Sequence, residues 1–212
     1  MSDLRYYGLY PAIVTNLVDP DQIGRVQVQL PWLGNGNDVR VWATLLTPYA
    51  DDDQGLQILP EVDTQVVVGF EAGDPHRAYI VGSCWNGKEM MPVSATRPNN
   101  KRVWRTRAKS SLEFDDTEGA AKVTLQMQSG HKIVLDDSAD QVEVTHSNGS
   151  TIKINAAGQI PVTANATVEV TASAVNVHAA TAAFDGIVRC TTLIASSGVV
   201  SPSYTPGAGN IW

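Results

Sequence analysis

The sequence predicts an all-β protein, with a small closed barrel in its first half and an intertwined, trimeric β-helix in its second. Short runs rich in Val, Ile and Thr alternate with polar residues and end at Gly, Asp, Asn or Pro, which is typical of strands. Helical periodicity is almost absent. In the second half of the chain a similar unit recurs after 21 and then 19 residues, which favours a stacked β architecture.

Residues 1–90 are predicted to form the barrel domain. Five strands are expected at 10–17, 25–30, 39–46, 64–70 and 78–84, with a turn at 19–24 between the first two. Five short strands with longer loops fit a small closed barrel such as an OB-fold, and closure removes exposed strand edges. The candidate core residues that stand out by type are Trp32, Trp42, Cys84 and Trp85.

Residues 91–108 are interpreted as a linker. Met91-Pro92 and Arg97-Pro98-Asn99 interrupt regular structure, because proline disfavours the helical conformation in the residue before it. The segment 101–109 is the most basic of the chain. We interpret it as a solvated linker or as a local ion-pair partner for Glu113, Asp115 and Asp116.

Residues 109–200 are predicted to form the trimeric β-helical spike. A unit of apolar residue, any residue, apolar residue and then Asp or Asn occupies 112–115, 133–136 and 152–155. Further alternating strands are expected at 123–127 and 142–145. Repetition of this kind is typical of structures built from stacked β units.

The run of small and β-branched residues at 162–177 suggests that three chains are needed. Each strand offers two or three medium-sized apolar groups; burying Val contributes about 1.5 to 3 kcal/mol, whereas ordering each residue costs about 1 to 2 kcal/mol. Three chains around one axis would bring every inward side chain against two copies of itself. A disordered linker and a monomeric β-solenoid remain alternatives. The predicted trimer core consists of Ile133, Leu135, Ile152, Ile154, Val168, Val170, Val175 and Val177.

Composition narrows the range of functions. The net charge of −7 argues against a nucleic-acid partner, which would require clustered Lys and Arg. The two cysteines, Cys84 and Cys190, form no CxxC motif, so a disulfide framework is not expected and assembly in a reducing cytoplasm fits. We expect neither a cleaved signal peptide nor a membrane-spanning helix.

No catalytic, cofactor or metal site is expected. The four histidines, His76, His131, His146 and His178, form no HxH or HExxH motif. His178 on a threefold axis could still offer three nitrogens to a metal, but we interpret it as a structural or solvent-facing residue. Acidic pairs such as Asp136-Asp137 are interpreted as turn residues. An enzyme is therefore not predicted.

Several motifs resemble the VgrG and phage tail-spike family. Residues 24–32, GRVQVQLPW, followed by Trp42-Ala43, are similar to the beginning of its OB-fold domain, as are 59–70 and 73–82. Glu61-Val62-Asp63 stands where the family has a glycine-bearing turn, and Ala78 lies near a position often held by proline. Residues 112–119 and 129–137 resemble the opening repeats of the family's needle. The resemblance covers nearly the whole chain.

This resemblance implies a homotrimeric, non-enzymatic central spike of a contractile tail, similar to short spikes of the baseplate assembly protein V type. The expected location is the virion tail baseplate, assembled in the host cytoplasm and acting on the bacterial outer membrane, which the needle pierces when the sheath contracts. The expected partners are baseplate hub and tail tube proteins, a possible PAAR-like tip protein and the target cell envelope, with no nucleic acid and no cofactor. The chain is too short for the lysozyme or hub domains of some relatives.

Residues 201–212 are predicted to form the tip. Three copies of Tyr204, Ile211 and Trp212 would meet there as a distal cap or as the platform for a tip protein, because a free Ile-Trp end would expose apolar surface. A frayed tail is the alternative. For the whole chain, the second hypothesis is an OB-fold module that binds glycan or peptide and carries an oligomerising β stalk.

Overall fold

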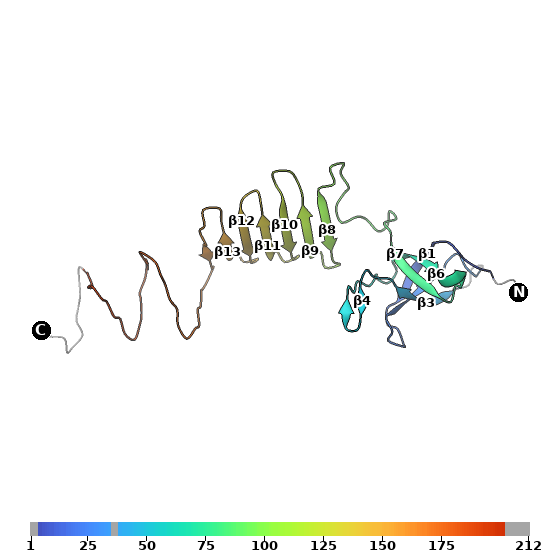
Figure 1. Cartoon of the computed structure of the whole chain (residues 1–212), viewed down its shortest axis with the longest axis horizontal. Helices are drawn as coiled ribbons and strands as arrows, with labels where there is room; N and C mark the ends of the chain where they lie inside the picture. Colours follow the sequence, from blue (N-terminus) through green and yellow to red (C-terminus); the bar gives the residue numbers. More distant parts are fainter. Residues whose placement is uncertain (1–3, 35–37, 202–212) are drawn as a thin grey trace. The chain divides into compact units, whose positions relative to one another are not determined.

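A computed structural model describes residues 4–34 and 38–201. These residues form strands, turns and one short 3-10 helix, η1 (Glu71–Gly73). The chain divides into two units, residues 1–166 and 167–212, and each is described by itself. The first unit contains a closed barrel and a seven-stranded sheet (Figure 1). No helix in the described ranges is long and apolar enough to cross a bilayer.

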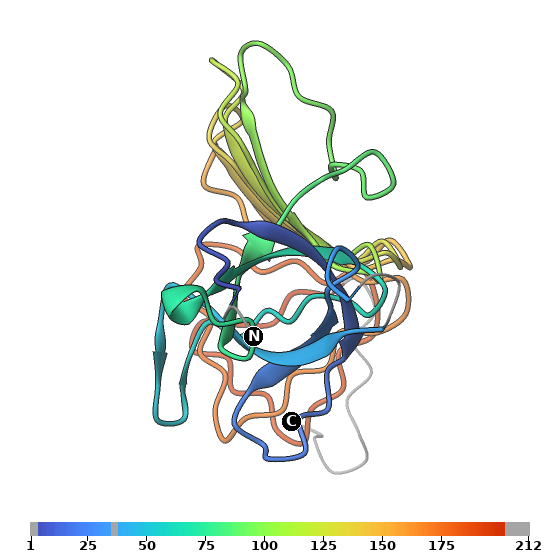
Figure 2. The same cartoon turned by 90° about the vertical axis from the view of Figure 1, so that its right-hand side faces the viewer.

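Five strands close the barrel in the order β1-β2-β3-β7-β6 (Figure 2). They are β1 (Tyr10–Asn16), β2 (Arg25–Gln29), β3 (Arg40–Leu45), β6 (Gln65–Phe70) and β7 (Ala78–Ser83). β3 and β7 run parallel, whereas the other neighbours run antiparallel. The five predicted strands and their closure into a barrel are confirmed.

Alternation along each strand builds the barrel core. In β2, Val26 and Val28 are fully buried, whereas the intervening polar residues are half-buried, as expected for a strand with one face toward a core. The other fully buried positions are small or β-branched, apart from Leu30; Leu30 and Ile80 are the largest core side chains. Cys84 and Trp85 are exposed, so their assignment to the core was wrong; both follow the end of β7 and lie outside the barrel core.

A two-stranded hairpin, β4 (Ala50–Asp51) with β5 (Gln54–Gly55), lies between β3 and β6. The following turn, Glu61–Thr64, replaces the glycine-bearing turn of the resembled family. Its left-handed position is held by Asp63, with φ of 66°, and aspartate tolerates this conformation better than most residues. The Asp63 N–H donates to the Val14 carbonyl at 2.9 Å, so the turn is tied to β1 despite the missing glycine.

Asp19 organises the turn between β1 and β2. Its buried carboxylate accepts hydrogen bonds from the backbone N–H groups of Asp21, Ile23 and Arg25 at 3.1 to 3.2 Å. The guanidinium of Arg25 adds two more, at 3.1 Å from Nε and 2.8 Å from Nη2. The Arg25 side chain and these N–H donors hold the pKa of Asp19 well below its usual 3.8.

Replacement of Asp19 by asparagine is expected to destabilise the barrel at neutral pH. The lowered pKa means that the ionised form stabilises the fold; this contribution is complete above the ordinary value of 3.8 and is lost as the pH falls toward the folded-state pKa. Urea unfolding followed by tryptophan fluorescence should give a lower midpoint for Asp19→Asn at pH 7, and the difference should narrow below about pH 4. Asp21→Asn is the control, because the Asp21 side chain is 67% exposed. An equal loss in both variants would contradict the central role of Asp19.

The seven-stranded sheet is an antiparallel meander in which every strand pairs with its neighbours in sequence (Figure 1). Its strands are β8 (Lys101–Arg105), β9 (Ser111–Asp115), β10 (Lys122–Gln126), β11 (Lys132–Asp136), β12 (Gln141–Thr145), β13 (Thr151–Ile154) and β14 (Val162–Thr163). The strands predicted from the recurring unit are thus present. The segment expected to be a linker at 91–108 contains β8, so the sheet begins at Lys101; three basic residues in five had concealed the strand pattern.

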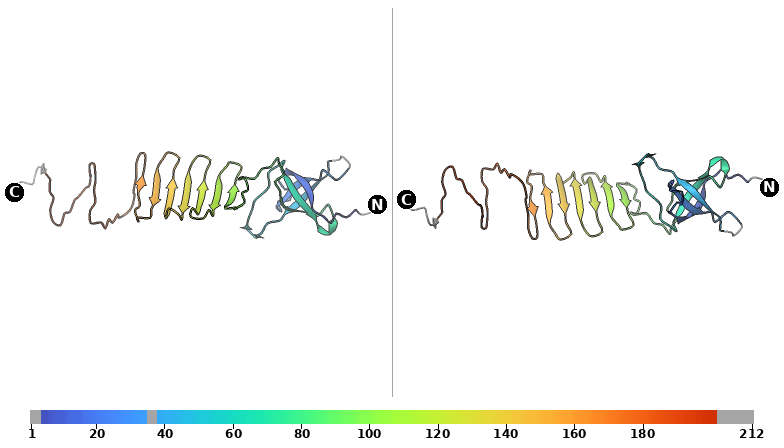
Figure 3. Two further views of the ribbon diagram at one scale, coloured as in Figure 1. Left: turned by 90° about the horizontal axis from the view of Figure 1, so that it is seen from above. Right: turned by 90° about the horizontal axis from the view of Figure 1, so that it is seen from below.

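In the second unit, the described residues 167–201 form no strand or helix and every one of them is exposed. The backbone runs in extended legs separated by bends at residues 173, 180, 185–186, 191 and 196–197 (Figure 3). Its β-branched residues include Val168, Val170, Val175 and Val177, which are 61 to 72% exposed. Within the described chain, residues 167–200 therefore belong to no strand, and their apolar side chains are left exposed.

Candidate functional site

One face of the seven-stranded sheet carries two parallel rows of apolar side chains. Cross-strand pairing places Phe114, Val123, Leu135, Val142 and Ile154 in one row. The second row contains Trp104, Leu112, Leu125, Ile133, Val144, Ile152 and Val162. We call these two rows together the apolar face. The face forms because strand residues alternate sides and the antiparallel register keeps like residues opposite one another.

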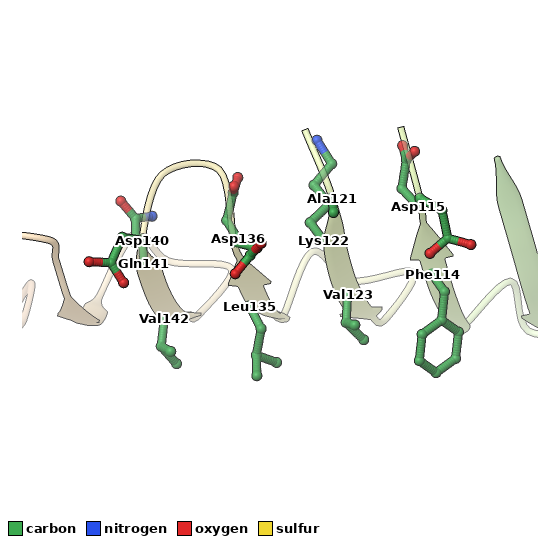
Figure 4. A pocket seen from close by; sticks show the side chains of 12 residues that line it. Phe114, Asp115, Ala121, Lys122, Val123, Leu135, Asp136, Asp140, Gln141 and Val142 are labelled. Atoms are coloured by element: carbon green, nitrogen blue, oxygen red, sulfur yellow. The ribbon is translucent and has the colours of Figure 1, made fainter. Parts of the chain in front are cut away.

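The apolar face is uncovered in the single chain. All of its side chains except Leu112 and Val123 are exposed, with Ile133 at 38% and Trp104 at 55%. Phe114, Val123, Leu135 and Val142 point to the same side of the sheet and line an open groove of about 370 Å³ (Figure 4). An uncovered apolar surface that extends across seven strands is characteristic of a binding interface.

The opposite face is polar and satisfied within the chain. Lys101 Nζ lies 2.7 Å from Glu113 Oε1, and Lys153 Nζ lies 3.5 Å from Glu143 Oε2. The hydrogen bond and charge of Glu113 raise the pKa of Lys101. Arg102, which is paired with Phe114 on the side of the apolar face, forms an ion pair with Asp116 at 2.7 Å, so the predicted ion pairing of the basic segment with Glu113, Asp115 and Asp116 is confirmed. This face needs no protein cover.

Turn residues at the strand ends are held by local hydrogen bonds. The Thr117 hydroxyl and backbone N–H donate to Asp115 Oδ1 and lower the pKa of Asp115. Ser138 Oγ donates to Asp136 Oδ1 at 2.6 Å, and together with the Ala139 N–H it lowers the pKa of Asp136. The assignment of Asp136 to a turn role agrees with these contacts.

The structure brings four of the predicted core residues together on this face. Ile133 and Ile152 both pair with Val144, and Leu135 and Ile154 both pair with Val142. Val168, Val170, Val175 and Val177 lie in the second unit, and their role stays a prediction. Tyr204, Ile211 and Trp212 lie outside the described residues.

Sequence reasoning missed most of the remaining apolar face. Val142 and Val144 were recognised as strand residues, but they were not assigned to a face. The length of the turn between two antiparallel strands fixes their register. Counting back from the turn at 137–140 would have placed Val142 opposite Leu135 and Val144 opposite Ile133, on the same face. Trp104 was missed because its neighbours Val103 and Arg105 belong to a run interpreted as a basic linker.

Histidines and cysteines are dispersed over the described ranges. His131 and His146 lie side by side, with ring centroids 4.3 Å apart, and His76 Nδ1 lies 3.1 Å from Asp74 Oδ1. Across residues 4–34 and 38–201, no three His, Cys, Asp or Glu side chains are grouped so as to hold a metal ion. The candidate site is therefore the apolar face, which is bounded by polar turns and suited to binding another protein surface.

Two family models match the chain. Residues 10–85 match the type VI secretion system/phage-baseplate injector OB domain. Residues 101–182 match the phage baseplate V C-terminal trimerisation domain, which begins where β8 begins. The first match coincides with the barrel, and the second contains the whole apolar face. A trimerisation domain implies a homotrimer.

The curated relatives include type VI secretion system spike proteins and a toxin. The type VI secretion system spike protein VgrG3 of Vibrio cholerae is 24% identical over 140 residues, which cover 62% of this chain and 14% of that protein. The actin cross-linking toxin VgrG1 of Vibrio cholerae is 25% identical over 63% of this chain and 13% of its own length. The spike protein VgrG5 of Pseudomonas aeruginosa is 26% identical over 58% of this chain and 17% of its own. The matched segment is thus less than one fifth of these relatives.

Proposed function

This chain belongs to the phage baseplate V family, whose OB domain and trimerisation domain relate it to VgrG spikes, and from this we propose that it is the central spike of a contractile tail baseplate. The family is structural and generally non-enzymatic. In the proposed role, the spike links the tail tube and hub to the tip and pierces the outer membrane of the target cell when the sheath contracts.

The observation that carries the proposal is the uncovered apolar face. Three copies of the sheet, turned with this face toward a common axis, would bury Ile133, Leu135, Val142, Val144, Ile152 and Ile154 against their symmetry mates. The polar face, which is already satisfied within each chain, would then face water. The three sheets would then form a rod with the apolar faces buried along its axis and the polar faces outside.

The exposed legs of residues 167–201 support a needle built from three chains. The legs have extended backbone and β-branched side chains, yet none of them pairs as a strand within residues 4–34 and 38–201. In a trimer, neighbouring chains supply both the hydrogen-bond partners and the apolar contacts. Such a needle bears compression because no open strand edge is left from which it could peel apart. Its proposed tip is the segment 201–212, as a cap or as the platform for a PAAR-like protein.

The barrel offers little support for a glycan- or peptide-binding module. The rings of Tyr6, Tyr10, Trp32 and Phe70 pack on one another with centroids 4.5 to 6.2 Å apart. Trp32 Nε1 donates to the Pro11 carbonyl at 2.8 Å, so its polar group is used internally. These half-buried rings therefore contact one another, and the indole N–H of Trp32 is not available to a ligand.

Removal of residues 167–212 tests the piercing role. We expect particles assembled with this shortened spike to contain trimeric protein, since the apolar face is retained, and to contract normally. They should no longer permeabilise target cells, because the proposed needle is missing. Sheath contraction is scored by electron microscopy and permeabilisation by uptake of an impermeant dye. Full permeabilisation by the shortened particles would contradict the proposal.

A further inference from the structure

The turns that connect the seven strands lie in two rows, one along each long side of the sheet where the strands end, and the two rows differ in charge. The turns β9–β10 and β11–β12 lie along one edge and supply Asp116, Glu118, Asp137 and Asp140. The turns β8–β9, β10–β11 and β12–β13 lie along the other edge and contain no carboxylate. We call the first the acidic edge. The second, the histidine edge, supplies Arg107, Lys109, His131 and His146.

His131 and His146 form the centre of the histidine edge. His131 immediately precedes β11 and His146 immediately follows β12, so the two rings flank the open end of one hairpin. The Ser147 N–H donates to His131 Nδ1 at 3.3 Å, and the Asn148 N–H donates to His146 Nδ1 at 3.2 Å. A neutral imidazole whose Nδ1 accepts a hydrogen bond carries its proton on Nε2. Each ring therefore presents an Nε2–H donor, for which the described chain provides no acceptor.

The turn that closes the same hairpin lies at the opposite edge and is acidic. Asp137 and Asp140 are both exposed, and neither forms an ion pair within the described chain. Asp136, by contrast, is already bonded to Ser138 and Ala139. β11 and β12 lie side by side, across the long axis of the sheet (Figure 3). The histidines lie at one end of this hairpin and the Asp137–Asp140 turn at the other, so both are at the same height along that axis.

Threefold symmetry determines which edges meet. In a cyclic arrangement of three identical sheets with their apolar faces inward, the contact is heterologous, so one edge of each sheet always adjoins the other edge of its neighbour. Rotation about the axis adds no shift along it, so the histidines of one copy lie level with the Asp137–Asp140 turn of the next. We propose that His131 and His146 donate from Nε2 to the carboxylates of Asp137 and Asp140 in the adjacent copy, forming three equal seams.

This seam rests on the trimer of the proposed function and adds to it a specific bonding between copies. Charge-assisted hydrogen bonds are stronger and more directional than apolar contact, so the seams would set the register of the three chains while the apolar face supplies adhesion. The partner of each edge is therefore a second copy of this chain.

A cycle of conservative variants tests the seam. In His131→Asn/His146→Asn, each Asn Oδ1 can replace Nδ1 as the acceptor of the local N–H, while the Nε2 donor is removed. Asp137→Asn/Asp140→Asn removes the opposing charges. Each pair is expected to lower the temperature at which an SDS-resistant trimer becomes monomer by roughly 3 to 6 °C. The transition temperature of the fourfold variant should be no lower than that of either pair, because both pairs remove the same contacts.

Asp52→Asn/Asp53→Asn is the matched control, since it makes the same charge change at the exposed tip between β4 and β5 and should leave the temperature unchanged. Additive losses in the fourfold variant, or no loss from either pair while light scattering still gives three times 22.7 kDa, would overturn the seam and leave the trimer standing. A monomeric mass for the unaltered chain would overturn the trimer and the seam together.

Discussion

Leu135→Asn is expected to abolish the trimer, whereas Val134→Asn in the same strand should leave it intact. Leu135 points to the apolar face between Val123 and Val142, whereas Val134 points to the polar face between Thr124 and Glu143. In a trimer, each replaced leucine forfeits about 1.5 to 3 kcal/mol of burial. The amide that replaces it, buried without a partner, costs roughly 1 to 3 kcal/mol more. Symmetry applies this loss three times.

The two variants distinguish a trimer from a monomer, because the exposure of these side chains in the single chain predicts that Val134→Asn is the more harmful of the two. Leu135 is 50% exposed in one chain, while Val134 is half-buried, so a protein that acted as a monomer would lose more from Val134→Asn. Light scattering gives the mass of each variant, and gel electrophoresis gives its resistance to SDS. A trimeric Leu135→Asn beside a disrupted Val134→Asn would exclude the apolar face as the trimer interface.

Leu30→Ala is expected to destabilise the barrel by about 2 to 5 kcal/mol, the usual cost of a large-to-small change in a closed core. Leu30 is fully buried, and it is among the largest side chains of a buried core whose other members are Val, Ala and Ile80. Such a small core has few neighbours that can move into the space. Chemical denaturation followed by tryptophan fluorescence would report the lowered midpoint.

The control for this variant is Leu46→Ala. Leu46 follows β3 and is 52% exposed, so its truncation should change stability by less than about 0.5 kcal/mol. The mass of Leu30→Ala should remain that of a trimer, since the apolar face is untouched. Equal midpoints for the two variants would show that Leu30 does not belong to the stabilising core.

Sequence periodicity predicted local structure well wherever it was regular. Val26 and Val28, separated by Gln27, specify a strand with one buried face whatever surrounds it. Ile133 with Leu135 and Ile152 with Ile154 likewise lie in strands with one apolar face, and their burial in a trimer core stays a prediction. β8 was not predicted because Lys101, Arg102 and Arg105 dominate its composition. In the folded sheet β8 pairs with β9, which brings Lys101 to Glu113 and Asp115 and Arg102 to Asp116.

Position in space also changed the interpretation of single residues. Trp85 and Cys84 have the composition of a core, but they follow the last hydrogen-bonded residue of β7 and remain exposed. Residue type gives the tendency to be buried, and only the end of the strand decides whether a neighbour is present to bury it. The His131–His146 pair was likewise hidden, because fourteen residues separate the two rings in sequence.

The sequence by itself determined the all-β character, the five barrel strands, the recurring unit of the second half and the family resemblance, because alternation and turn residues act over a few neighbouring positions. Tertiary structure alone decided that seven strands share one register, that twelve apolar side chains form two rows on one uncovered face, and that opposite edges carry histidines and carboxylates. The physical reason is that a strand fixes only the side to which each residue points. Which strands lie beside it, and what its face then contacts, depends on hydrogen-bonded pairing between segments distant in the chain.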